Sequence, residues 1–531
     1  MKKIVGLSII SATILIAGGD ITNMDNRYDD GLRAEIEALK AEVAELKKIT
    51  TQKSQKNSNS KLEKKIERLS KRLNEVKAHD AKDNIKWGVD FRTSVDNISY
   101  TMGDGSEREN KDLYSNRLWL NMRYKPSDNV VFKGQLAYNK AYGASMPDNG
   151  GSTFQRGFSS GFDTFDWVIN ENLTDDTIKL RQAYWLYLGN DFLGTGLSWT
   201  ASVGRRPSTT GFLANLREDD IAQSPLGHLI DVEFDGASSK IELEDVTDIE
   251  GMAFKVCLGQ GATNAVARFD GTGDQASYVG ASDVAKDIRL AGFIFTPYDD
   301  NQFTVKTTAY KAFNVPGFQQ DFTSDPTGRT MKFDTTGDML GAGISLLVNG
   351  LTDDMDESEF LYATKLFASF AWSKSKPDGN SQMMGMMGPN GVIGASPGED
   401  KTGISYWVGA QVPVSYFGGK LGAEYNHGSQ YWRPFTYGED TMIGSKLATR
   451  GNAFEVYYTQ PLAKGLSAQI RWTKIDYDYT GSQGFFGAGG APIKISDLKA
   501  GAASGDATSQ AMLASTIEKS QDIRAYIRYR F

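Results

Sequence analysis

Eight basic residues stand at alternating positions in stretches where apolar and polar side chains also alternate. They are Arg117, Arg123, Lys133, Arg181, Arg205, Arg524, Arg528 and Arg530, and Arg92, Arg289 and Arg471 occupy similar positions. Cationic groups fixed on one face of a wall attract anions, so these residues are candidates for lining a selective passage. The alternative is that they pair with Asp90, Asp96, Glu424 and Glu455 as interior packing.

A second charged group, Arg217, Glu218, Asp219 and Asp220, lies in the long segment between residues 206 and 236. An acidic loop opposite a basic wall would create a transverse field at a constriction. General-diffusion porins fold one loop inward for this purpose, and the same role for this segment is an assignment by analogy.

Motifs for catalysis are missing from the positions where their structural context would require them, including GxSxG, HExxH, Walker A and the Rossmann fingerprint. Cys257 is the only cysteine, which excludes intrachain disulfides, cysteine-ligated zinc and covalent haem. His427 with Ser429 could suggest a hydrolase pair, and Met383–Gly388 a Cu(I) site, but loop roles explain both better. We expect no enzyme activity, cofactor or metal, and the net charge of −8 gives no reason to expect nucleic-acid binding.

The C-terminal residues predict a β-strand that carries Arg524, Arg528 and Arg530. Ile523, Ala525, Ile527, Tyr529 and Phe531 fall on one face of a strand, and Arg524, Tyr526, Arg528 and Arg530 on the other. An apolar face behind an arginine-rich face suits a wall between lipid and water. The pattern Ile527, Tyr529, Phe531 also resembles the recognition signal of the barrel-assembly machinery. The alternative is an edge strand of a soluble sandwich.

The same period of two recurs from Trp87 onward and predicts about sixteen strands. The stretches lie near 87–95, 117–124, 130–139, 178–188, 197–206, 237–245, 251–260, 286–297, 302–313, 337–348, 359–374, 403–413, 418–427, 452–460, 465–478 and 521–531. The fold class is therefore an all-β transmembrane barrel of antiparallel strands over residues 85–531.

The connections between these stretches alternate between short and long. The long segments are 101–114, 140–177, 207–236, 261–285, 314–336, 375–402, 428–451 and 479–520. Short periplasmic turns alternating with long external loops are the layout of a transmembrane barrel, whereas a soluble sandwich has no reason to sort its loops in this way.

The N-terminal residues have a different composition. Residues 1–19 read as a signal peptide and 20–31 as a leader. Residues 32–78 carry two short heptad segments, formed by Leu32, Ile36, Leu39, Val43 and Leu46, and by Leu62, Ile66, Leu69, Leu73 and Val76. We expect an α-helical periplasmic coiled coil that assembles a homotrimer; the alternative is a helical hairpin folded on itself.

Two blocks carry a family resemblance. One comprises Gly204–Gly211, then Ser224–His228 and Phe234–Gly236; the other is Gly422–Trp432 followed by Lys446–Gly451 and Glu455–Tyr458. They resemble an uncharacterised family, a domain of unknown function, identified as outer-membrane porins of delta- and epsilon-type proteobacteria with a helical N-terminal segment. The resemblance implies location and architecture, and it brings no substrate and no functional residue.

These observations favour a water-filled channel for small hydrophilic or anionic solutes, with a weak preference for anions. Its expected partners are outer-membrane lipid, the barrel-assembly machinery and two further copies of the chain. The alternative is an outer-membrane scaffold or binding protein with little solute flux, including the barrel sheath of an electron-transfer conduit.

Overall fold

The computed structural model describes residues 85–143, 178–262, 287–320, 326, 331–353, 358–388, 391–414, 416–436, 439–482 and 490–531. The expected signal peptide, leader and coiled coil lie outside these residues. Within the described residues, no helix has the length and apolar character needed to cross a membrane.

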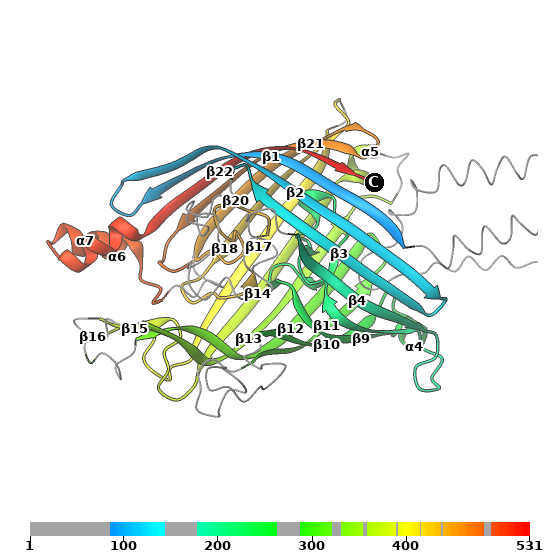
Figure 1. Ribbon diagram of the computed structural model, residues 1–531, viewed down its shortest axis with the longest axis horizontal. Coiled ribbons are helices and arrows are strands. Elements are labelled where there is room, and N and C mark those ends of the chain that lie inside the picture. The colour runs from blue at the N-terminus through cyan, green and yellow to red at the C-terminus, as the bar shows by residue number, and fades with distance from the viewer. Residues whose placement is uncertain are drawn as a thin grey trace, which may run out of the picture.

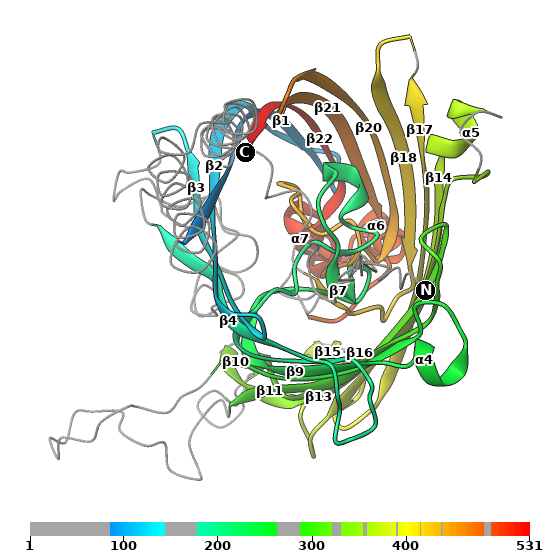
Figure 2. The same cartoon turned by 90° about the vertical axis from the view of Figure 1, so that its right-hand side faces the viewer.

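Sixteen strands form one closed barrel (Figures 1 and 2). They are β1 (Lys86–Met102), β2 (Glu107–Ser127), β3 (Val130–Ala141), β4 (Lys179–Gly189), β5 (Trp199–Arg206), β9 (Phe234–Glu242), β10 (Ala253–Ala262), β11 (Ile288–Asp299), β12 (Phe303–Gln320), β13 (Met331–Asn349), β14 (Lys365–Pro377), β17 (Lys401–Val414), β18 (Gly419–Gly428), β20 (Gly451–Ala463), β21 (Leu466–Tyr477) and β22 (Ile517–Arg530). The prediction of sixteen antiparallel strands is confirmed.

The barrel closes where the last strand meets the first. β22 pairs antiparallel with both β21 and β1. Phe531 extends this pairing, because its N–H donates to the Val89 carbonyl at 3.0 Å and its carbonyl accepts from the Val89 N–H at 2.8 Å. Every strand of the barrel therefore has two neighbours, and no edge is left open.

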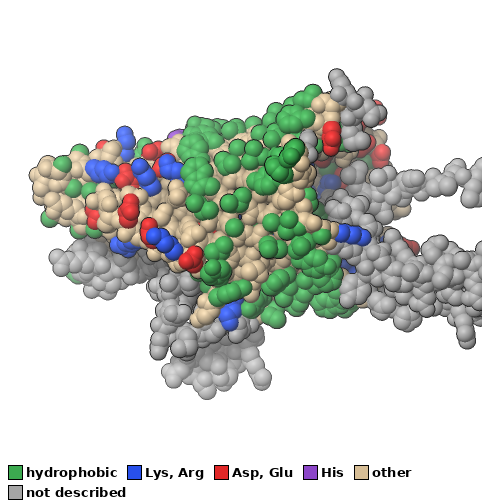
Figure 3. All heavy atoms as spheres, turned by 90° about the horizontal axis from the view of Figure 1, so that it is seen from above, with side chains coloured by type: hydrophobic (Ala, Val, Ile, Leu, Met, Phe, Trp, Pro, Cys, Tyr) green, Lys and Arg blue, Asp and Glu red, His purple; other side chains and the backbone are tan. Residues whose placement is uncertain are grey.

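The two faces of the strands differ in chemistry as period two predicts. On β22, Ile523 and Ile527 are 42% and 55% exposed, whereas Arg524 and Arg528 are 0% and 1% exposed. Figure 3 shows the outer surface of the barrel, where apolar side chains cover the middle and charged side chains gather toward the ends. The wall thus separates an apolar exterior from a charged interior.

The two ends of the barrel carry different connections (Figure 1). The short turns, with α4 (Glu244–Thr247) and α5 (Glu359–Ala363), lie at the end that also holds the C-terminus. At the other end are α6 (Ile495–Ala503), α7 (Ala507–Ser515) and the hairpin of β15 (Gly385–Gly388) and β16 (Gly391–Gly394). This sorting follows the alternation of segment lengths in the sequence.

Several details of the sequence prediction differ from the structure. The segment 314–336 is not a long loop, because β12 and β13 stay paired as far as Gln320 and Met331. The segment 101–114 is not a long loop, because β1 and β2 stay paired as far as Thr101 and Glu107. Strand ends beyond an apolar belt meet water on their outer face, so their polar residues do not mark a loop. α5 occupies the start of the stretch 359–374, and the segment 479–520 contains α6 and α7, whose nine-residue lengths are too short to show a clear helical period.

The interior contains an apolar core in addition to charged side chains. Two segments between barrel strands, residues 207–233 and 429–450, pack against β11–β17 from inside. Leu213, Leu226, Leu229, Trp432 and Leu447 of these segments are all fully buried. Buried apolar surface of this kind favours a fixed position for both segments.

Candidate functional site

The segment 207–233 crosses the barrel interior; we call it the first inward loop. It contains β6 (Gly211–Phe212), the short helix η1 (Leu216–Glu218), β7 (Gln223–Leu226) and β8 (Ile230–Asp231). Figure 2 shows β7 inside the ring of barrel strands. The Gln411 side chain donates to the Leu216 carbonyl at 3.1 Å, and Gln469 donates to the Arg217 carbonyl at 3.0 Å. The tip of the loop therefore rests on β17 and β21, far from the strands that hold its ends.

His228 fixes the middle of this loop to the wall. Its Nδ1 lies 2.8 Å from Ser369 Oγ on β14, and its Nε2 lies 2.9 Å from Ser405 Oγ on β17. The ring is fully buried between the side chains of Trp407 and Trp432. Burial lowers the pKa of His228 from 6.5 to about 3, so the imidazole is neutral at physiological pH.

The segment 429–450 forms a second inward loop. Its β19 (Phe435–Thr436) pairs in parallel with β8, and the Phe435 N–H donates to the Leu229 carbonyl at 2.9 Å. Trp432 Nε1 donates to the Leu447 carbonyl at 2.7 Å within the loop. The two inward loops thus form one body inside the barrel.

Acidic and basic side chains, most of them buried, join both loops to one side of the wall; we call this group the paired charge cluster. Its members are Asp90, Arg92, Asp96, Arg117, Arg217, Glu218, Asp220, Glu424, Asp440, Lys446, Glu455, Arg471, Arg524 and Arg528. Each basic member has a carboxylate within 4.0 Å. Their charges are therefore compensated within the chain.

Arg528 ties the first inward loop to the closing strands. Its guanidinium contacts both carboxylate oxygens of Asp90 on β1. It also lies 2.6 Å from Asp220 Oδ1 and donates to the Glu218 carbonyl at 3.0 Å. Tyr526 adds a hydrogen bond to Glu218 Oε2 at 2.6 Å.

Asp440 joins the second inward loop to the strands where the barrel closes. Its carboxylate accepts from Arg92 at 2.5 and 2.7 Å and lies 3.3 Å from Arg524. The Arg524 Nε donates to Asp96 at 2.5 Å, so the same arginine joins the loop to β1. Lys446 of the same loop lies 2.6 Å from both Glu424 and Glu455 on the wall.

The carboxylates of Glu218 and Asp440 are ionised despite burial. Burial raises the pKa of Glu218, and Asp440 raises it further, but Arg217, Arg92 and Arg471 outweigh both and bring it to about 2. Burial also raises the pKa of Asp440, and Arg92 and Arg524 overcome this and hold it well below its usual value. The loops are therefore anchored by charge over the physiological pH range.

The remaining predicted passage-lining residues fall into several environments. Arg181 lies 3.5 Å from Glu233 of the first inward loop, and Arg205 lies 3.8 Å from Asp235. Arg123 and Lys133 are half-buried and lie opposite each other on β2 and β3. Arg530 is the most exposed arginine of β22 and lies 3.1 Å from Asp220.

The structure corrects two inferences about these charges. Arg289 does not face inward: it lies on the outward side of β11 with the exposed Phe293. No gap separates the acidic tip of the loop from the basic wall, because Glu218 and Asp220 contact Arg528 directly. For Arg117, Arg524 and Arg528, pairing with Asp90 and Asp96 is what the structure shows.

Sequence reasoning missed Asp440 and Lys446 as parts of the cluster, and His228 as an anchor. The blocks Ser224–His228 and Lys446–Gly451 stood out in the sequence, but alternation cannot place a loop residue against a strand. The residues considered for catalysis have local roles. His427 Nδ1 lies 3.1 Å from Asn452 Oδ1, and Ser429 Oγ accepts from the Ile404 N–H. Among the described residues, no group of His, Cys, Asp or Glu could hold a metal.

The geometry defines a closed β-barrel with an apolar exterior and a charged interior that holds two docked loops. The chain belongs to the family described as protein of unknown function (DUF3373), whose profile matches residues 107–531. No curated protein matches the chain.

Solved structures with a similar arrangement are distant in sequence. Pseudomonas putida OprB aligns over 86% of this chain and 96% of its own, with 11% identity and a TM-score of 0.45. The anion-selective porin from Comamonas acidovorans aligns over 84% and 100%, with 11% identity and a TM-score of 0.42. Salmonella typhi OmpF, in complex with daunomycin, aligns over 85% and 99%, with 11% identity and a TM-score of 0.41.

Proposed function

We propose that the chain is an outer-membrane porin through which small hydrophilic solutes diffuse. The observation that carries this proposal is the reversal of chemistry across the wall: apolar side chains outside, ionised side chains inside, on sixteen closed strands. In a soluble protein, the exposed apolar belt would be a liability, whereas lipid accepts it. Barrels of sixteen strands are wide enough for an aqueous passage.

The inward loops set the width of the proposed passage. They fill the part of the interior that faces β11–β17 and the closing strands. Half-buried polar side chains such as Arg123 and Lys133 line β2 and β3. The proposed route for solutes therefore runs along β2–β4, with a weak anion preference carried by basic residues outside the paired charge cluster.

Assembly and association are part of the proposal. Ile527, Tyr529 and Phe531 are 55%, 42% and 36% exposed on the outer face of β22, where an assembly factor can contact them. We propose that residues 32–78 form a periplasmic coiled coil that joins three copies. The heptad pattern of these residues supports this part of the proposal.

A second candidate is an outer-membrane scaffold or binding protein with little flux. The apolar core inside the barrel favours it, because residues such as Leu213, Leu226 and Trp432 occupy space that a wide channel would leave to water.

Uptake by proteoliposomes distinguishes the two candidates. Folded protein is reconstituted, and swelling is followed in a pentose, a disaccharide and a neutral dextran. The porin proposal predicts swelling in the pentose and none in the dextran. Liposomes that carry the heat-denatured protein are the control. Impermeability to all three solutes, by protein that is folded and inserted, would leave only the scaffold candidate.

A further inference from the structure

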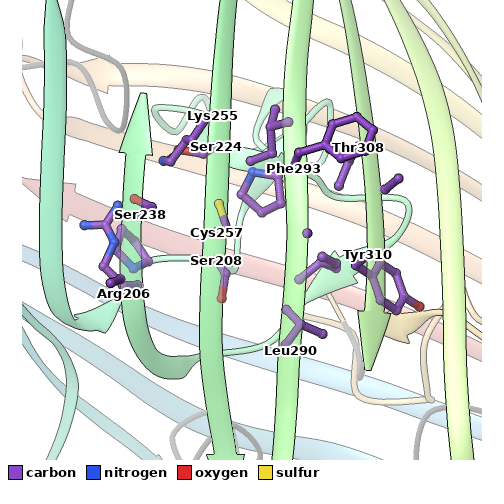
Figure 4. Close-up of a pocket in the computed structure, with 17 residues that line it drawn as sticks. Arg206, Ser208, Ser224, Ser238, Lys255, Cys257, Leu290, Phe293, Thr308 and Tyr310 are labelled. Carbon is purple, nitrogen blue, oxygen red and sulfur yellow. The ribbon is translucent and has the colours of Figure 1, made fainter. Parts of the chain in front are cut away.

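A small cavity lies behind the first inward loop, between that loop and β9–β12 (Figure 4). The centre of a water molecule can move through about 40 Å³ of it. Ser224 and Pro225 line it from the loop, and Arg206 at the end of β5, Lys255, Cys257 and Leu290 line it from the strands. In Figure 4, Cys257 lies between Lys255 and Ser208. We call this cavity the cationic pocket.

Two buried basic side chains line the pocket. Arg206 and Lys255 are each 7% exposed. The Arg206 guanidinium stacks on the Tyr184 ring at 4.1 Å, and its Nη1 has no hydrogen-bond partner in the described part of the chain. Lys255 Nζ donates to Ser224 Oγ at 2.6 Å.

Neither cation forms an ion pair with a carboxylate among the described residues. Burying an ionised group without compensation is expensive, and a counter-charge in the same site offsets that cost. The paired charge cluster supplies such counter-charges from the chain. In the cationic pocket, an anion from outside the chain can supply them.

The lining narrows the class of anion. Space of this size holds about three water molecules, so the ligand is compact. The planar guanidinium of Arg206 fits the two oxygens of a carboxylate, and Lys255 adds a point charge. Pro225, Ile230 and Leu290 offer hydrocarbon contact but no donors, which disfavours strongly hydrated divalent ions.

We propose that the cationic pocket binds a short monocarboxylate of the size of acetate, with its carboxylate at Arg206 and Lys255 and its methyl group against Pro225 and Leu290. The inference concerns binding, and it stands whether or not the barrel conducts solutes. No covalent step is involved.

Cys257 supplies a built-in reporter, because it is the only cysteine of the chain and lines the pocket. The folded protein in detergent is treated with methyl methanethiosulfonate, a small neutral thiol reagent, in the presence of acetate or of its neutral isostere acetamide. We expect acetate to slow the labelling of Cys257 in a saturable way, and acetamide to have no effect. Equal protection by both would overturn the proposal.

Substitutions assign the effect to the two cations. Arg206→Gln and Lys255→Met should each raise the acetate concentration needed for protection by about tenfold or more, because each removes a charged hydrogen-bond partner. Lys125→Met, at the half-exposed end of β2, is the matched control and should leave protection unchanged. Unchanged protection in Arg206→Gln and Lys255→Met would also contradict the proposal.

A second measurement tests acetate binding if the labelling of Cys257 is too slow to follow. Saturation-transfer NMR on the methyl protons of acetate should show transfer from the wild-type protein, and loss of transfer in Lys255→Met but not in Lys125→Met. Transfer that persists in Lys255→Met, or is missing from the wild-type protein, would rule out the site.

Discussion

Two regions of the barrel interior differ in how their buried basic side chains are paired. In the paired charge cluster, each basic side chain has a carboxylate within 4.0 Å, as Arg528 has in Asp90 and Asp220. In the cationic pocket, Arg206 and Lys255 are as deeply buried but have no such partner among the described residues. The ion pairs of the cluster hold the loops against the wall, whereas the basic side chains of the pocket are available to bind the proposed anion.

The position of each region matches its role. The cluster joins both inward loops to β1 and β20–β22, where the barrel closes. The pocket lies on the other side of the first inward loop, at β9–β12. The first inward loop therefore lies between the paired charge cluster, which is structural, and the cationic pocket, which is the proposed binding site. This contrast predicts opposite consequences when charges are removed from the two regions.

The largest effect should follow Arg528→Met. The change removes one cation and leaves Asp90, Glu218 and Asp220 without it in a buried site. Breaking a buried ion pair by removing one partner costs about 3–5 kcal/mol of unfolding free energy. Urea titration of the folded protein in lipid vesicles measures this cost.

Arg530→Met is the matched control for that change. The Arg530 side chain is 37% exposed, lies 3.1 Å from Asp220 and donates to the Asp219 carbonyl at 3.0 Å, and at this exposure its loss should cost about 1 kcal/mol or less. Similar costs for the two substitutions would show that burial and multiple pairing at Arg528 do not matter.

A smaller effect should come from pH through His228. The folded state holds this imidazole neutral with a pKa of about 3, against 6.5 for an ordinary histidine, so the unfolded chain binds the proton more readily. The stabilising contribution is complete above pH 6.5 and is lost as the pH falls toward 3. The loss should be about 1.4 kcal/mol per pH unit in that window.

Other groups also titrate in this range, so the test is a difference between two proteins. The unfolding free energy of the wild-type protein is compared with that of His228→Asn at pH 7.5, 6.5 and 5.5. The variant should be less stable at high pH, and the gap should narrow as the pH falls. A gap that stays constant would show that protonation of His228 is not linked to folding.

The smallest effect should follow Lys255→Met, and it should have the opposite sign. The change removes a buried basic group whose one hydrogen-bond partner among the described residues is Ser224, and it keeps most of the side-chain volume. In the absence of any added anion, the unfolding free energy should rise by on the order of 1 kcal/mol. A loss as large as that expected for Arg528→Met would mean that Lys255 belongs to a compensated network.

The wall of this barrel could be predicted from sequence because it depends on period two alone. Alternation in the stretch from Ile523 to Phe531 separates Arg524 and Arg528 from Ile523 and Ile527, and the structure keeps this separation. The pairing of Arg528 with Asp90 does not follow from the closure alone, because the register sets Arg528 opposite Arg92 and Asp90 opposite Arg530.

The contents of the barrel could not be predicted in this way. Asp440 lies 348 residues from Arg92 in the chain, and no local pattern links the two. His228 meets serines of β14 and β17 only because the loop crosses the interior. Such contacts depend on the course of a loop in three dimensions, and no periodicity in the sequence predicts that course.

We propose that the docked loops set the width of a conducting barrel. Single-channel recording in planar bilayers tests it, with the wild-type protein, Glu218→Gln with Asp440→Asn, and the control Asp245→Asn with Asp248→Asn on an exposed turn. The first pair removes the loop charges that contact Arg92, Arg471, Arg524 and Arg528. We predict discrete openings of the wild-type and control proteins, and larger openings of the first pair. Openings of equal size in all three proteins, or no openings from a folded and inserted wild-type barrel, would contradict the claim.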